Sequence, residues 1–456
     1  MRVGRCVRGI ACAGVGLAVG LLPLGGVSAQ EALPGVSLGL QYADAYLPAL
    51  ALKPFTGSFG GAGVAPQVEA IVGRDLRNSD RFEVMDSLPV GLVGDDVVDY
   101  SLWDRLGAVW LVSGQVEGAG EGFVLILELH DVVYGEVRER GRFRLPQPSD
   151  EDFRMSVHRT SDEIVRWATG DPGMAASRIA FTMTDNEGNK DVYVIDSDGE
   201  NLDRVTRYNN LVESPAWSMD GERLALTSWK TGVPRIYEVD RFGGNEKMVP
   251  PVRGAGDYIT PTYHPDGKTL AFSVLGSDSR SGIFTYDVEQ GCCLSYLSGG
   301  PWYDISPTYS PDGRWMAFNT LRFGDQVPQV MLMPGEGGSA ETLSPYEYGN
   351  GGYYTSPDWS PNGDLVAFHG RIDFRGRYHI LVANLEDNGR VLRQLTSEGN
   401  NEDPSWAPDG RHLVFVGERS WGFGLMIVDV TNGRVRSLLG GRRVGVPDWS
   451  PALAPR

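Results

Sequence analysis

The sequence predicts a mainly β protein, in which a six-bladed β-propeller follows a small α/β domain. One short phrase, proline, any residue and an aromatic, recurs six times in the second half of the chain. The first prolines of successive copies lie 43 to 50 residues apart, and most copies continue into a Ser-Pro-Asp-Gly-like turn. One aromatic and one tight turn per repeat of this length are typical of propeller blades. Sixty glycines and 28 prolines suit a chain with many turns.

Residues 1–29 are expected to be a signal peptide that is cleaved near Ala29. A basic segment containing three arginines precedes an apolar stretch, Ile10 to Leu24, and Val27-Ser28-Ala29 offers the small residues of a cleavage site. The alternative is a membrane anchor, but an apolar run of about 15 residues is short for a membrane span. Export is therefore the prediction, with no membrane span in the mature chain.

Residues 30–48 are small, polar and punctuated by proline, which predicts a flexible N-terminal arm. Residues 49–170 then follow the pattern of an α/β domain. The expected strands are Ala49–Lys53, Val109–Val112, Phe123–Leu129 and Glu136–Leu145, and the expected helices are Val64–Asn78, Leu102–Leu106 and about Ser149–Trp167. Ser149 is the candidate N-cap of the last helix. A breaker cluster at 170–173 ends the domain.

Residues 177–453 are expected to form the propeller. In each repeat the motif proline starts the innermost strand, where its missing N–H costs little. The aromatic residue should point into the space between neighbouring blades, and the proline and glycine of the following turn preset its backbone. The six aromatic residues are Trp217, Tyr263, Tyr309, Trp359, Trp406 and Trp449.

The ends of the repeat region predict how the ring closes. The sixth motif ends at Trp449-Ser450-Pro451 with no strands after it, whereas the segment Arg178–Thr182 has the second strand of a repeat but no motif before it. The last strand should therefore pair with that segment in one blade. Closure of this kind leaves a ring of six blades without a free edge.

The net charge of the chain argues against one class of partner. A net charge of −18 argues against nucleic acid, whose phosphates would be repelled.

After signal cleavage only Cys292 and Cys293 remain, and adjacent cysteines cannot link distant segments. Two unpaired or turn-forming thiols are the expectation, and a vicinal disulfide is the alternative.

The propeller motifs, taken with several N-terminal segments, resemble the TolB family of the Tol–Pal system, whose repeats are WD40-like (PD40). The N-terminal segments are Asp75-Leu76-Arg77-Asn78-Ser79, Arg81-Phe82, Asp86 and Gly114-Gln115-Val116. Met219 replaces the turn proline of the first copy, and His264 replaces the serine of the second. The arm at 30–48 matches the N-terminal peptide of the family poorly.

The resemblance implies a periplasmic adaptor that is not an enzyme. It implies binding of the peptidoglycan-associated lipoprotein Pal over the propeller mouth, and binding of the inner-membrane protein TolA through the N-terminal arm. It also implies a role in outer-membrane integrity and in constriction during cell division. The chain would then be peripheral to the outer membrane through its partner.

The candidate partner-binding residues lie in the links that lead from one blade into the inner strand of the next. These links should reach one face near the propeller axis, and they are rich in the aromatic, amide and acidic groups found at interface centres. The candidates are Asn209, Asn210, Glu213, Asp257, Tyr258, Ile259, Trp302, Tyr303, Asp304, Tyr353, Tyr354, Asn400, Asn401 and Glu402.

The sequence predicts no catalytic, cofactor-binding or metal-binding residue. The sequence has no nucleophile elbow and no H-E-x-x-H motif. The acidic segment Asp185–Asp191 lacks the distal glutamate of a calcium loop and is expected to be a polar turn. Two alternatives stay open: a propeller associated with a hydrolase, and a propeller that binds a small sugar or a cation in its channel.

Overall fold

The computed structural model describes residues 46–85, 97–251, 256–276, 281–323, 327–345, 352–371, 376–385 and 392–454. The predicted signal peptide and residues 30–45 of the predicted arm lie outside this range. The described residues belong to one compact unit, 36–456. Among them, no helix has both the length and the apolar character needed to cross a bilayer.

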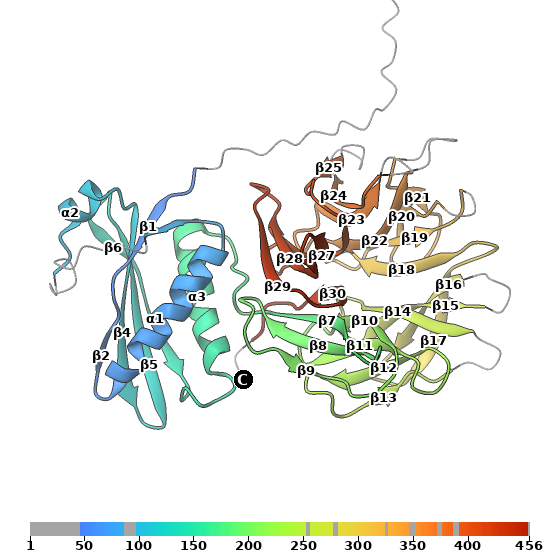
Figure 1. The fold of residues 1–456 in the computed structure, drawn as a ribbon, viewed down its shortest axis with the longest axis horizontal. Coiled ribbons are helices and arrows are strands. Elements are labelled where there is room, and N and C mark those ends of the chain that lie inside the picture. The colour runs from blue at the N-terminus through green and yellow to red at the C-terminus, as the bar shows by residue number, and fades with distance from the viewer. Residues whose placement is uncertain are drawn as a thin grey trace, which may run out of the picture. The chain divides into compact units, whose positions relative to one another are not determined.

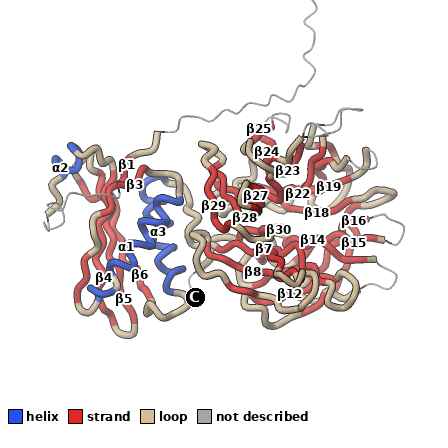
Figure 2. Tube along the Cα trace, viewed as in Figure 1, coloured by secondary structure: helices blue, strands red, loops and turns tan. Residues whose placement is uncertain are grey.

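The N-terminal part is an α/β domain, as expected. A mixed sheet has the strand order β3-β1-β4-β5-β6, with β2 paired to β4. Helices α1 and α3 pack against each other and against this sheet, as Figures 1 and 2 show. The elements are β1 (Ala49–Leu52), β2 (Thr56–Ser58), η1 (Gly61–Gly63), α1 (Ala65–Asn78), β3 (Glu83–Met85), α2 (Tyr100–Arg105), β4 (Trp110–Ala119), β5 (Gly122–Asp131), β6 (Glu136–Leu145) and α3 (Phe153–Thr169).

The apolar spacing seen in the sequence forms the core of this domain. Val68 and Leu76 of α1 share one buried cluster with Val157 and Ile164 of α3. The start of α3 differs from the expectation. The helix begins at Phe153, and Ser149 is not its cap, because residues 147–153 first form a turn in which Asp150 accepts the backbone N–H of Asp152.

The second part is a propeller of six four-stranded sheets within the described residues. Its strands are β7 (Arg178–Thr184), β8 (Lys190–Asp196), β9 (Asp203–Arg204), β10 (Val212–Trp217), β11 (Arg223–Ser228), β12 (Arg235–Asp240), β13 (Lys247–Met248), β14 (Asp257–Tyr263), β15 (Thr269–Leu275), β16 (Ser281–Asp287), β17 (Cys292–Ser298), β18 (Asp304–Tyr309), β19 (Trp315–Thr320), β20 (Gln329–Pro334), β21 (Glu341–Thr342), β22 (Tyr353–Trp359), β23 (Leu365–Arg371), β24 (His379–Asn384), β25 (Leu392–Gln394), β26 (Asn401–Trp406), β27 (His412–Arg419), β28 (Gly422–Asp429), β29 (Val435–Gly440) and β30 (Val444–Trp449).

Blades are numbered here by their inner strands: β10, β14, β18, β22, β26 and β30 for blades 1 to 6. The inner strands neighbour one another in that order, and β30 neighbours β10. Blade 6 joins the two ends of the repeat region, since β30 pairs antiparallel with β7 in the order β30-β7-β8-β9. Figure 1 shows the red β30 beside the green β7. The predicted closure is confirmed.

The motif aromatics lie between blades, as the sequence predicts. Trp406 of blade 5 shares a buried cluster with Ile380 and Val382 of blade 4. Trp449 of blade 6 shares another with Val414 and Ile427 of blade 5. All six aromatic residues are buried. Each aromatic therefore fixes one blade against its neighbour.

The residue before each motif proline has a left-handed backbone, which the sequence analysis did not anticipate. The φ angles of these six residues lie between 42° and 54°. A register shift accompanies this residue in every inner strand, for example between Glu213 and Ala216 in β10. A register shift of this kind is a β-bulge, which changes the direction of the side chains that follow it. The residues concerned are Ser214, Thr260, Ser306, Ser356, Asp403 and Val446.

Cys292 and Cys293 form a vicinal disulfide at the start of β17. The expectation of two unpaired or turn-forming thiols is therefore wrong. Both residues belong to the reversal between β16 and β17, where Gly291 and Cys293 have positive φ angles of 67° and 68°.

Candidate functional site

The links between blades form the candidate site, called here the link face. Their neighbours are the hairpins that join the second and third strands of each blade. Asn210, before β10, donates from Nδ2 to the carbonyl oxygen of Trp229 just after β11, at 3.1 Å. Asn400, before β26, bonds Glu418 near the end of β27 at 2.7 Å. Links and hairpins therefore lie together at the same end of the blades.

Most of the sequence-predicted residues on this face are available to a partner. Asn209 and Asn210 are exposed, and the side chain of Trp302 is 40% exposed. The others are partly buried: Glu213, Asp257, Ile259, Tyr303, Tyr353, Asn400 and Glu402. These ten residues are the ones that the link face presents.

Four of the predicted residues are buried, and the expectation that they lie on an exposed surface is wrong. Tyr258 packs on Phe272 with ring centroids 4.9 Å apart, and Tyr354 packs on Phe368 at 5.8 Å. Burial raises the pKa of Tyr354 to about 12. Both tyrosines alternate along an inner strand with residues that face the other way, so a link aromatic can belong to the core.

The other two buried residues hold the links in place. Asp304 is fully buried and accepts from Thr320 Oγ1 and from Arg322 Nη2, each at 2.7 Å. Asn401 is also fully buried, donates from Nδ2 to the carbonyl of Glu398 and accepts from Arg419 Nη1. Their polar groups are used inside the blade, which is why they do not face a partner.

The structure adds cationic residues that the sequence analysis missed. Lys190 Nζ lies 2.7 Å from Glu213 Oε1, and Arg235 Nη1 lies 3.8 Å from Asp257 Oδ1. Both cations start the third strand of a blade, next to a link. A basic residue that opens the third strand of a repeat was the available signal. The link face therefore carries paired charges of both signs.

An aromatic cluster lies on the link face of blade 4. The rings of Tyr353 and Tyr378 are 5.3 Å apart, and Tyr378 lies 5.5 Å from the ring of His369. The guanidinium of Arg371 stands over Tyr353 and Tyr378, at 5.4 and 5.1 Å from their centroids. Rings and guanidinium groups bind partners through large planar contacts at small entropic cost.

In the motifs of blades 3 to 6, the middle residue bonds the next inner strand of the ring. Asp358 Oδ2 accepts the backbone N–H of Trp406 at 2.7 Å, and Asp448 Oδ2 accepts that of Trp217 at 2.6 Å. Inner strands surround the axis of a propeller, so these carboxylates belong to its inner ring. Burial raises the pKa of Asp358 to about 6. Burial, together with the charge of Asp358, raises the pKa of Asp448 to about 8.

This ring makes stability depend on pH. The pKa of Asp448 is about 8 in the folded protein and about 3.9 in an unfolded chain. The folded state therefore holds an extra proton between these values, and stability falls as pH rises from about 4 through about 8. Asp448→Asn, which keeps an oxygen acceptor for Trp217, is expected to be more stable than wild type at pH 8 by about 1–3 kcal/mol.

Urea titrations at pH 5 and pH 8 measure this difference. The exposed Asp203 of β9 supplies the matched control, because Asp203→Asn should leave the pH dependence of wild type unchanged. Equal pH dependence in wild type and Asp448→Asn would contradict the assignment.

A buried ionic cluster joins the α/β domain to the propeller. Asp80 Oδ1 accepts from Arg434 Nη1 at 3.0 Å, and the carbonyl of Asp80 accepts from Arg411 Nη2 at 2.8 Å. The ring of His412 lies between Asp409 and Asp80, with Nδ1 2.6 Å from Asp409 Oδ2. Burial opposes the charged ring, but Asp409 and Asp80 outweigh it and raise the pKa of His412 to about 9. Asp80 lies between α1 and β3, and the propeller residues lie in or next to turns between strands, at the ends of the blades away from the links.

Two family models match the chain. The TolB beta propeller domain matches residues 165–453, and the TolB amino-terminal domain matches residues 43–137. The first of these spans more than half of the sequence.

Curated relatives agree with the family models. The chain is 32% identical over 200 residues to a protein named Tol-Pal system protein TolB from Albidiferax ferrireducens; the alignment covers 43% of the chain and 46% of the relative. It is 31% identical over 214 residues to the protein of the same name from Methylococcus capsulatus, with 45% and 49% covered. The chain thus spans about half the length of the curated relatives that it matches.

Solved structures support the fold. The structure of TolB from Acinetobacter baumannii superimposes with a TM-score of 0.75 at 24% identity, covering 90% of this chain and 98% of that chain. A hydrazine synthase from Kuenenia stuttgartiensis superimposes with a TM-score of 0.51 at 12% identity, covering 60% of this chain and 47% of that chain. At these identities the likeness concerns the architecture alone.

Proposed function

Because the chain belongs to the TolB family, we propose that it is a periplasmic adaptor of the Tol–Pal system that binds the lipoprotein Pal on its link face. The adaptor is not an enzyme, and through Pal it supports outer-membrane integrity and constriction during cell division. The single observation that carries this proposal is the composition and exposure of the link face.

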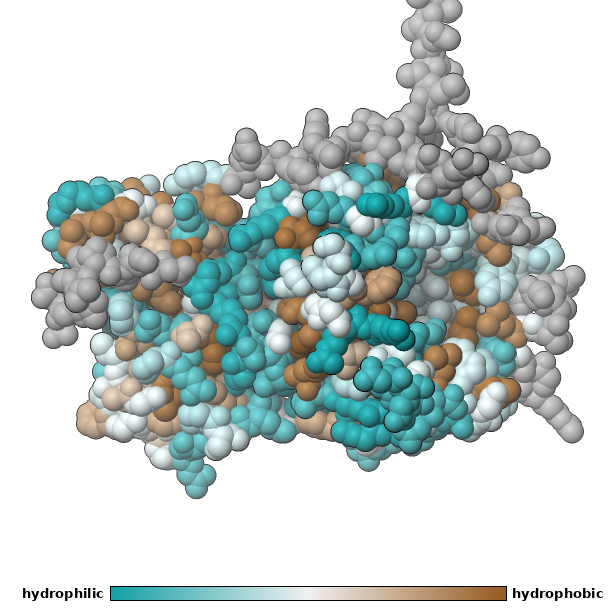
Figure 3. All heavy atoms as spheres, viewed as in Figure 1, coloured by the Kyte–Doolittle hydropathy of each residue, from teal (hydrophilic) through white to brown (hydrophobic). Residues whose placement is uncertain are grey.

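The link face offers what a protein partner requires. Trp302 and the Tyr353–Tyr378 pair supply partly exposed aromatic area near the axis. Exposed Asn209 and Asn210 supply adaptable hydrogen-bonding groups around it. Interface centres are enriched in such aromatic residues, and a specific complex buries on the order of 1,600 Å². Figure 3 shows hydrophilic and hydrophobic residues mixed over the side of the molecule that it draws.

Negative charge on the link face favours a partner with basic groups. Burial, with the charges of Asp403 and Glu418, raises the pKa of Glu402, so a cation placed beside it would be stabilised. The carboxylates of Glu213 and Asp257 also lie on this face, each paired with one cation. We infer that a lysine or arginine side chain of Pal meets Glu402.

The TolA contact of the proposal rests on the N-terminal arm, which lies almost wholly outside the described residues. It is the second contact of the proposed adaptor and is independent of the link face. A protein without the N-terminal arm that still captures Pal would agree with two independent contacts, one through the arm and one through the link face.

A pair of tryptophans tests the proposed face. Trp302 and Trp315 are 40% and 43% exposed, and they stand at opposite ends of the hairpin formed by β18 and β19. Trp302→Ala is expected to weaken Pal binding at least tenfold, because an aromatic residue near an interface centre contributes strongly. Trp315→Ala, the matched control, should bind Pal as wild type does.

The measurement is calorimetry with purified Pal, followed by capture of Pal from cross-linked envelopes. If both variants bind Pal equally well, the assignment of the link face is wrong. Tyr258 is unsuitable for this test because it is buried, so its replacement would disturb the blade itself.

A further inference from the structure

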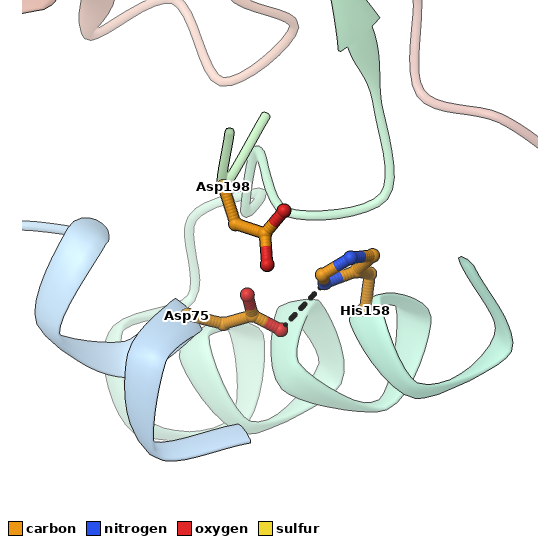
Figure 4. A group of neighbouring side chains, drawn as sticks. All are labelled: Asp75, His158 and Asp198. Carbon is orange, nitrogen blue, oxygen red and sulfur yellow. Dashed lines mark hydrogen bonds and ion pairs between the residues drawn. The ribbon is translucent and has the colours of Figure 1, made fainter. Parts of the chain in front are cut away.

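Three donor side chains from three distant segments meet where helices α1 and α3 contact the propeller. Asp75 comes from α1, His158 from α3 and Asp198 from the turn after β8. One ligand atom of each lies within 4.8 Å of the others. Figure 4 shows the three side chains grouped together. These residues are far apart in the sequence, so only the fold brings them together.

Two atoms of this group are buried and have no hydrogen-bond partner. The side chains of Asp75 and His158 are 2% and 0% exposed. Oδ2 of Asp75 accepts from Ser161 Oγ at 2.6 Å and meets His158 Nδ1 at 2.8 Å, but Oδ1 of Asp75 and Nε2 of His158 are unpartnered. Buried polar atoms without partners are rare and costly. In Figure 4 the free oxygen of Asp75 points at the carboxylate of Asp198.

Two carboxylates facing each other away from water need a cation or a proton between them. A small cavity adjoins Asp75 and is lined also by Ser161, Asp162, Met174 and Ser197. Of the three donors, only Asp75 lines this cavity.

The arginines near Asp198 pair with Asp198 but have no hydrogen bond to Oδ1 of Asp75. Asp198 Oδ2 accepts from Arg154 and, at 3.4 Å, from Arg74. Each guanidinium also has a second carboxylate, since Arg74 pairs with Glu200 at 2.8 Å and Arg154 Nε lies 4.0 Å from Asp196. Arg178 Nε also lies 3.0 Å from Asp196, but Oδ1 of Asp75 stays without a hydrogen-bond partner in the described part of the chain.

We propose that Asp75, His158 and Asp198 bind a divalent transition-metal ion of the zinc class. One imidazole and two carboxylates are ligands that zinc accepts, and three protein ligands leave a fourth position for water. Magnesium and calcium prefer oxygen ligands alone, so the histidine favours the zinc class. The bound ion would tie α1 and α3 to the turn after β8.

A second group of donors, Asp80, His412 and Asp429, is also close enough to hold a metal ion, but its atoms already have partners. Around His412 both ring nitrogens are engaged, Nδ1 by Asp409 at 2.6 Å and Nε2 by Asp80 at 3.4 Å. Arg411 and Arg434 take up the remaining negative charge. Since no donor of this cluster is left unpartnered among the described residues, it serves as an internal control.

Zinc binding to the purified, chelator-stripped protein tests the proposal. Wild type is expected to bind one zinc ion per chain by calorimetry and to retain it through gel filtration, as measured by elemental analysis. Asp75→Asn should lower zinc affinity at least tenfold. Asp80→Asn is the matched control, because Asp80 is also a buried aspartate beside a buried histidine, and it should bind zinc as wild type does.

Two results would overturn the site: no stoichiometric zinc in wild type, or equal zinc in wild type and Asp75→Asn. If Asp75→Asn fails to fold by circular dichroism, X-ray absorption at the zinc edge of the wild-type protein decides. One imidazole and oxygen ligands would support the site, and any other ligand set would refute it.

Discussion

Trp406→Ala is expected to lower the free energy of unfolding by about 3–5 kcal/mol, the range for losing a buried tryptophan. Trp406 is 4% exposed and lies in the cluster shared by blades 4 and 5. Its indole Nε1 also donates to the carbonyl of Asp358 at 3.2 Å. The substitution therefore opens a cavity between two blades and leaves a buried carbonyl without this donor, two costs that add.

Trp421→Ala provides the matched comparison. Trp421 is 48% exposed in the hairpin between β27 and β28, within the same blade, so its loss should change stability by less than about 1 kcal/mol. Urea denaturation followed by far-ultraviolet circular dichroism measures both variants without relying on tryptophan fluorescence. A similar loss of stability in the two variants would refute the proposed role of the motif aromatic.

Removing β30 is expected to have the largest effect, namely loss of cooperative folding. A chain that stops at Gly441 would leave the edge of β7 without its partner strand. It would also lose Trp449, whose indole Nε1 donates to Ser177 Oγ at 2.7 Å, and the bond from the Leu453 N–H to the carbonyl of Ala176. An exposed edge strand invites pairing with other chains, so the truncated protein should aggregate.

Complementation makes this prediction specific to ring closure. A synthetic peptide of residues 442–454, added during refolding, is expected to restore a soluble, cooperatively unfolding protein. The same peptide with Trp449→Ala should restore much less, because the buried indole fills the space between blades 5 and 6. A chain shortened only by residues 455–456 should unfold as wild type does. A cooperative, monomeric truncation at Gly441 would show that closure is dispensable.

Repetition is why so much of the propeller could be predicted. The same motif occurs six times, so the structural role assigned to its proline, its aromatic residue and its turn in one copy is supported by the other five copies. The unrepeated α3 had no such support, and its start was placed four residues too early, at Ser149 instead of Phe153. A lone serine before a helix resembles a cap whether or not the chain uses it.

The link face shows the limit of composition as a guide. Tyr258 and Tyr303 look alike in the sequence, as aromatic residues that precede a motif proline. In the structure Tyr258 is buried against Phe272, whereas Tyr303 is partly accessible. The position in the repeat decides the difference, because side chains alternate between the two faces of a strand. Tyr303 stands four residues before its motif proline, whereas the four buried candidates all stand three residues before theirs: Tyr258, Asp304, Tyr354 and Asn401.

The sequence by itself determined the six blades, the aromatic between each pair of blades and the closure by the last strand, because turn chemistry and periodic burial act over a few residues. The tertiary structure alone decided the left-handed residue before each motif proline, the paired carboxylates of the inner ring, and the meeting of Asp75, His158 and Asp198. These features arise where segments distant in the sequence come into contact, as Asp75 and His158 do, or where one blade constrains the next. Contacts of that kind leave no local pattern in the sequence.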